Sequence, residues 1–128
     1  MSAWTPERLT AVGGAEELQI SSRRRDGSIR PPITIWVVRV GDELFVRSAY
    51  GVDNPWFRRA KASGSGRIVA GGVEADVDFA FVDETDAALQ AEIDAAYHAK
   101  YDRYGPAIVG TVVDEHSWPT TIRLVALD

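Results

Sequence analysis

The stretch from Gly27 to Gly51 constrains the fold of this chain more than any other segment. Pro31-Pro32 disfavours a helix and holds the backbone extended as it enters the next segment. Residues Ile33–Val40 are almost all β-branched or aromatic, which is typical of a strand. Gly41-Asp42 can supply a two-residue turn, and Glu43–Tyr50 alternates as a return strand. We therefore predict a β-hairpin at the centre of the fold.

The pleat of the return strand fixes the direction of each side chain. Alternation places two sets of residues on opposite faces: Phe45, Arg47 and Ala49 on one, and Leu44, Val46, Ser48 and Tyr50 on the other. Because a strand is rigid, Arg47 is aimed in one direction. It is therefore a candidate binding residue.

The other segments predict a mainly antiparallel sheet with few helices. The predicted helices are a short one at Pro55–Ser63, a long one at Asp83–Tyr104, and a first turn at Pro6 with Thr5 as its N-cap. Further strands are predicted at Glu17–Ser21, Gly66–Gly72, Val73–Phe81 and Thr120–Leu127. Three acidic side chains alternate with apolar ones in the third of these strands, so we expect its acidic face in water. The pattern indicates an α+β, mainly β domain of about six strands.

Length and composition bound the possible functions. With 128 residues and no linker, we expect residues 1–128 to form a single split-barrel-like domain. The absence of cysteine excludes disulfides and thiolate metal sites. No apolar run reaches the length of a membrane helix, and the N-terminus has no signal pattern. We therefore expect a cytoplasmic protein that does not interact with membranes.

Charge is segregated along the chain. Residues 23–67 contain ten Lys and Arg against four Asp and Glu, or +6, although the whole chain carries −5. Overall acidity argues against nucleic acid as a partner, whereas a confined basic patch suits a small anion. The loop Ser21–Ser28 contains three consecutive arginines and is a further candidate anion site. The alternative is that these arginines are solvated or paired with acidic residues.

The sequence offers little catalytic chemistry of its own. His98 and His116 lie far apart without ligand spacing, so we expect no metal, and no catalytic residue is assigned. The long helix carries a tyrosine-rich stripe that includes Tyr97 and Lys100. These two residues are candidate contacts for a ligand, although tyrosines at this spacing also occur in packed cores.

Several blocks carry a resemblance to a known family. IWVVRVGDELFVRS and AAYHAKY, with WFRRA, GGVEADVDF and TTIRLVAL, resemble the uncharacterised bacterial family called domain of unknown function 2255, over roughly residues 15–127. The order of elements is more distantly similar to the FMN-binding split barrel and to the deazaflavin-dependent nitroreductases. Arg30-Pro31-Pro32 stands where that group has a G-x-x-R-T-P segment. This chain is shorter than the proteins of that group, and the basic residues that they cluster together are spread here over several elements.

The resemblance implies a split β-barrel-like sheet of about six antiparallel strands with one short and one long helix. It also implies a homodimer that binds FMN or a deazaflavin (F420). Candidate contacts for the cofactor's phosphate are Arg47, Ser48, Arg58 and Arg59. Arg30 is the candidate for a second anionic or carbonyl group, and Trp36, Tyr50 and Trp56 are candidates for ring stacking.

The sequence is compatible with three functions. The first is a flavin- or deazaflavin-dependent oxidoreductase, in which the cofactor carries the hydride. The second is a non-catalytic binder of a small anionic or aromatic ligand. The third is a dimeric accessory protein whose basic patch meets an acidic partner protein.

Overall fold

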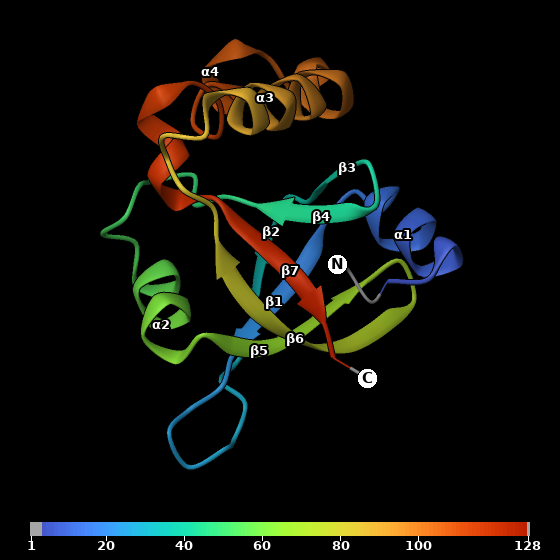
Figure 1. Cartoon of the computed structure of the whole chain (residues 1–128), viewed down its shortest axis with the longest axis vertical. Helices are drawn as coiled ribbons and strands as arrows, with labels where there is room; N and C mark the ends of the chain where they lie inside the picture. Colours follow the sequence, from blue (N-terminus) through green and yellow to red (C-terminus); the bar gives the residue numbers. More distant parts are fainter. Residues whose placement is uncertain (1–3, 128) are drawn as a thin grey trace.

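A computed structural model describes residues 4–127 as one curled antiparallel sheet with helices around it (Figure 1). The strands are β1 (Leu18–Ser22), β2 (Ile33–Ile35), β3 (Val38–Val40), β4 (Glu43–Val46), β5 (Ser65–Ala70), β6 (Val73–Phe81) and β7 (Ile122–Ala126). The helices are α1 (Pro6–Gly13), α2 (Pro55–Ser63), α3 (Ala87–Tyr101) and α4 (Pro106–Val109), with 3-10 turns at Asp102–Tyr104 and Glu115–Thr120. The predicted α+β, mainly β, split-barrel-like fold is confirmed.

Neighbouring strands follow the order β2-β1-β5-β6-β7-β4-β3, and every pair is antiparallel. The predicted hairpin turns are present at Gly41, with φ of 60°, and at Gly71-Gly72, with φ of 56° and 80°. Along β6, apolar side chains alternate with exposed Glu74, Asp76 and Asp78, as predicted. The sequence period of two thus places the inner face of this strand correctly.

The predicted continuous strand Ile33–Val40 is wrong, because the structure divides it in two. β2 pairs with β1 at one end of the sheet, and β3 pairs with β4 at the other end. Trp36 and Val37 connect the two ends. Strand propensity reports a preference for extended backbone and carries no information about the partner strand. The opening of the split barrel therefore lies at this two-residue connection.

Helix α3 supplies the hydrogen bonds that Val37 lacks within the sheet. The hydroxyl of Tyr101 accepts from the Val37 amide at 3.2 Å. The ammonium of Lys100 donates to the carbonyls of Val37 at 2.7 Å and Gly13 at 2.8 Å. The Trp36 ring stacks on the Tyr101 ring, with centroids 4.0 Å apart and planes 5° apart. The connection is therefore held by side chains from a helix.

Arg47 lies in the interior at the end of β4, with 2% of its surface exposed. Its guanidinium donates to Asp94 Oδ1 at 2.5 Å, to the Val112 carbonyl at 2.7 Å and to Thr121 Oγ1 at 2.9 Å. It also donates to Gln90, at 2.6 Å to Oε1 and at 3.3 Å to the carbonyl. An arginine has five N–H donors, so all of them are used. These bonds tie β4 to α3 and to the segment before β7.

Several predicted element boundaries also shift. The return strand ends at Val46, four residues before the predicted end, where the hydrogen bonds of Arg47 and Ser48 leave the sheet. The long helix begins at Ala87, because Asp86 caps it by accepting from the Leu89 amide at 3.3 Å. The closing strand begins at Ile122, after a 3-10 turn.

Replacing Arg47 with methionine tests its structural role. The change leaves Asp94 and two carbonyls without their buried donor, and breaking a buried ion pair costs about 3–5 kcal/mol. We expect a loss of that size in the free energy of unfolding, measured by urea denaturation. The exposed Arg39, whose closest carboxylate lies at 3.9 Å, provides the control, and Arg39→Met should cost less than about 1 kcal/mol. Equal effects of the two changes would contradict this role.

Burial lowers the pKa of Lys100 to about 8 from an ordinary value of 10.5. Between pH 8 and 10.5 the unfolded chain keeps the proton that the folded chain has lost, so this residue makes stability rise with pH. The neutral amine retains two N–H donors for its two carbonyl partners. We expect the stability difference between the wild type and Lys100→Met to increase in favour of the wild type across this range. A flat difference would contradict the shifted pKa.

Candidate functional site

Two adjoining cavities lie beside α2. The first, here called the aromatic pocket, has a volume of about 490 Å³. It is lined mainly by apolar and aromatic side chains: Glu17, Ile33, Thr34, Ile35, Trp36, Arg47, Ala49, Tyr50, Asn54, Pro55, Trp56, Arg59, Ile108, Thr111 and Val112. This size and composition are typical of pockets that bind small molecules.

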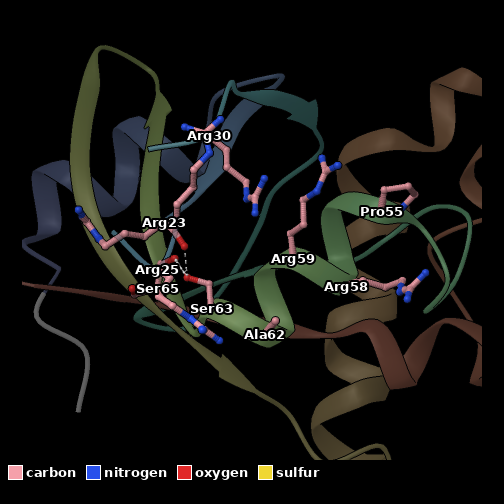
Figure 2. Close-up of a pocket in the computed structure, with 10 residues that line it drawn as sticks. Arg23, Arg25, Arg30, Pro55, Arg58, Arg59, Ala62, Ser63 and Ser65 are labelled. Atoms are coloured by element: carbon pink, nitrogen blue, oxygen red, sulfur yellow. Dashed lines mark hydrogen bonds between the residues drawn. The ribbon is translucent and has the colours of Figure 1, made fainter. Parts of the chain in front are cut away.

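The second cavity, here called the arginine pocket, has a volume of about 780 Å³. It is lined by Arg23, Arg24, Arg25, Arg30, Pro55, Arg58, Arg59, Ala62, Ser63 and Ser65 (Figure 2). Pro55 and Arg59 line both cavities. The two pockets therefore form one continuous surface with an apolar part and a basic part.

The sequence of α2 explains how it contributes to both pockets. Pro55 occupies the first turn, and Gly64 ends the helix with a φ of 75°. Trp56, Phe57 and Ala60 are buried against the sheet, which leaves the two arginines on the outer side. Figure 2 shows that the Arg58 and Arg59 side chains leave the helix in different directions, and Arg59 is the one that lines both pockets. Arg59 is therefore the arginine of this helix best placed to meet a ligand that spans both pockets.

Three aromatic residues define the walls of the aromatic pocket. Trp36 is fixed by its stack on Tyr101 and by a tilted contact with Tyr104 at 5.5 Å between centroids. Tyr50 is 79% exposed, whereas Trp56 is only 7% exposed and packs edge-on against Phe57. Trp36 is therefore the pre-positioned ring, and Tyr50 is free to adjust.

Seven of the ten predicted site residues line these pockets: Arg47, whose role is internal, and six others. Trp36, Tyr50 and Trp56 line the aromatic pocket, Arg30 and Arg58 line the arginine pocket, and Arg59 lines both. Ile33, Ile35, Ile108 and Thr111 also line the aromatic pocket but were not predicted. A hydrophobic residue that faces a pocket has the same sequence signal as one that faces the core.

Arg47 and the other three predicted residues have internal roles. Arg47 borders the aromatic pocket, but every N–H of its guanidinium is used inside the chain, so none remains for a phosphate. Ser48 is buried, with its hydroxyl donating to the Gly51 carbonyl at 2.8 Å. Tyr97 is buried, and burial raises the pKa of its hydroxyl. Lys100 is committed to two carbonyls. We therefore leave these four out of the site proposed below.

The chemistry of the pockets favours binding over side-chain catalysis. Within residues 4–127, no group of three or more histidine or acidic side chains could hold a metal ion. Glu17 is the one carboxylate among the residues that line the two pockets. General acid–base catalysis needs groups with complementary roles close to the substrate. The arrangement instead suits a planar apolar ring joined to an anionic group.

No helix among the described residues has the length and apolar character to cross a membrane. The exposed acidic side chains of β6 do not line either pocket.

The chain is similar in fold to a solved structure named F420 reductase. The TM-score is 0.55 at 14% sequence identity, and the match covers 94% of this chain and 93% of that one. At this identity the likeness establishes the fold alone. A comparison with curated proteins gives no match.

The family of this chain follows from a match to a sequence model. The model of an uncharacterized protein conserved in bacteria, DUF2255, matches residues 8–124. This range includes both sides of the aromatic pocket, α2 and the whole sheet except the last two residues of β7. The chain therefore belongs to the DUF2255 family.

Proposed function

We propose that this protein binds a flavin or deazaflavin cofactor and acts as an oxidoreductase. The observation that carries this proposal is the continuous surface of the aromatic and arginine pockets, with Arg59 at their junction. The fold likeness to an F420 reductase supports the same conclusion. FMN and deazaflavin F420 both combine a planar ring system with a phosphate, so the two halves of the surface match the two halves of such a ligand.

The residues that line the two pockets are suited to binding a flavin or deazaflavin. Trp36 and Tyr50 offer aromatic faces to the ring, and Ile33 and Ile108 offer apolar contacts. Arg30 and Arg59 line the arginine pocket and would hold the phosphate, because arginine binds phosphate oxygens in pairs. When bound, the cofactor would supply hydride transfer. The chain would bind and orient the ring and exclude water from one of its faces.

Replacing Arg59 with glutamine tests the assignment of the phosphate. We expect the affinity for FMN or F420 to fall about tenfold or more, because a hydrogen bond to a charged group contributes about 1.5–3 kcal/mol. Binding is measured by the quenching of ring fluorescence. The control is Lys61→Gln, which removes one charge from an exposed position on the same helix and outside both pockets.

Riboflavin, which has the ring and no phosphate, makes this test specific. Its weaker affinity should be the same in the wild type and in Arg59→Gln. If Arg59→Gln and Lys61→Gln weaken FMN or F420 binding equally, the effect is one of overall charge, and Arg59 does not bind the phosphate.

A non-catalytic binder of a small anionic or aromatic ligand is the second candidate. It is favoured by the scarcity of acid–base groups, since Glu17 is the one carboxylate lining either pocket. The two functions separate in one experiment, in which the flavin or deazaflavin is supplied in its reduced form. If the bound reduced cofactor passes its hydride to an added acceptor faster than the free reduced cofactor does, the result supports the oxidoreductase. Binding without any such acceleration supports the second candidate.

We also propose that the protein forms a homodimer through the β2 edge of the sheet. Ile33 is 40% exposed and Thr34 is exposed, and among residues 4–127 this edge has no partner strand. An uncovered edge strand readily pairs with another chain. Light scattering at micromolar concentration should give twice the monomer mass, and Thr34→Pro should reduce it to the monomer mass. A wild-type monomer would contradict the proposal.

A further inference from the structure

The arginine pocket is larger and more basic than one phosphate requires. Six of its ten lining residues are arginines, and none is acidic. A cleft lined by several charges of one sign raises the local concentration of ions of the opposite sign, here anions. The proposed function uses only Arg30 and Arg59, so the three arginines of the Arg23–Arg25 segment have no role in it.

Most of these arginines have no protein partner to neutralise them. Within residues 4–127, the side chains of Arg25, Arg30, Arg58 and Arg59 make no hydrogen bond or ion pair. Arg23 lies 3.5 Å from the Asp76 carboxylate, which also accepts from Arg67 at 2.9 Å. Five of the six guanidinium groups in the pocket thus make no ion pair among the described residues, although Asp26, in the same turn as Arg24, interacts with it electrostatically.

The loop that contains Arg23–Arg25 is a hydrogen-bonded turn that contacts the end of α2. The Gly27 amide donates to the Arg24 carbonyl at 2.9 Å, and the Arg24 amide donates to the Ser28 carbonyl at 2.7 Å. The Ser63 hydroxyl donates to the Arg23 carbonyl at 2.7 Å. The turn projects from the sheet at the bottom of Figure 1. Its position relative to the helix is therefore fixed by hydrogen bonds.

The length of α2 separates the two ends of the pocket. Pro55, which also lines the aromatic pocket, opens the helix, and Ser63, which contacts the arginine turn, closes it. At a rise of 1.5 Å per residue these positions are about 12 Å apart along the helix axis. One phosphate cannot contact all six guanidinium groups of a pocket of this length, because its hydrogen bonds are only about 3 Å long.

We propose that the Arg23–Arg25 turn is a second anion site, distinct from the phosphate site next to the aromatic pocket. The protein therefore recognises two anionic groups. This inference rests on the proposed function only for the identity of the first group. The second group, a phosphate or a carboxylate, belongs either to the same ligand or to an anionic co-substrate.

Alkane diphosphonates of increasing chain length test the proposal without any flavin. Affinity for the wild-type protein should rise with the spacer until both ends of the pocket are reached, to about tenfold above that of a monophosphonate of equal length. Arg25→Gln should remove this gain, so that the longest diphosphonate binds no more tightly than the monophosphonate. Arg25 is exposed and unpartnered within the described residues, so the variant is expected to fold. Lys61→Gln is the matched control and should keep the gain.

The outcomes separate this proposal from the proposed function. Diphosphonate binding that depends on Arg25, in a protein that binds neither FMN nor F420, supports the second anion site and contradicts the flavin proposal. FMN or F420 binding without any dependence of diphosphonate affinity on spacer length or on Arg25 overturns the second site alone.

A competition experiment identifies the source of the second group. If saturating FMN leaves the Arg25-dependent binding of a monophosphonate intact, the site serves a co-substrate. If a ligand with ring, phosphate and distal carboxylates displaces that monophosphonate and loses affinity in Arg25→Gln, the second group belongs to the same ligand. Loss of the Arg25 dependence in both arms overturns the second site.

Discussion

The guanidinium of Arg47 joins parts of the chain that no strand pairing connects. Its five donors meet acceptors from α3, from the segment after α4 and from the residue before β7. The Asp94 carboxylate also accepts from the indole N–H of Trp118 at 3.2 Å. Because a buried charge is costly without partners, these elements keep their positions together or separate together. Val112 and Ala49 line the aromatic pocket, and the Val112 carbonyl accepts one of the Arg47 hydrogen bonds. The same arrangement therefore holds part of the pocket wall in place.

The second constraint on the structure is that the sheet does not close between β2 and β3. β2 and β3 are consecutive in the chain yet lie at opposite edges, and Trp36-Val37 crosses between them. The crossing leaves backbone groups without a strand partner, and Tyr101 and Lys100 satisfy those of Val37. The same crossing presents Trp36 to the aromatic pocket. The split in the barrel and the candidate ring-binding wall thus have one structural cause.

Individual strands and helices could be predicted from the sequence where side-chain alternation and turn residues indicate the same element. Sequence reasoning located β6 and α2 at their exact bounds, and it placed Arg30, Arg58 and Arg59 near one another. It failed where the deciding contact is distant in sequence. The partners of Arg47 lie 43 to 74 residues away, so a period of two could fix its direction but could not reveal that the direction leads inward. A buried, saturated arginine and a ligand-binding arginine have the same local signal.

The same reasoning explains why the apolar part of the site was harder to find than the basic part. Unpaired arginines are costly to bury and therefore mark a surface, whereas Ile108 and Ile33 resemble core residues in every local respect. Ile108 is 49% exposed and Ile33 is 40% exposed because of the positions of α4 and of the sheet edge in the fold. The local sequence does not contain this information.

A crystal structure of the protein with FMN or F420 tests the central claim most directly. The account predicts electron density for the ring against Trp36 in the aromatic pocket and for the phosphate within hydrogen-bond distance of Arg59. A ring bound elsewhere, or a phosphate held by residues outside the arginine pocket, would contradict it.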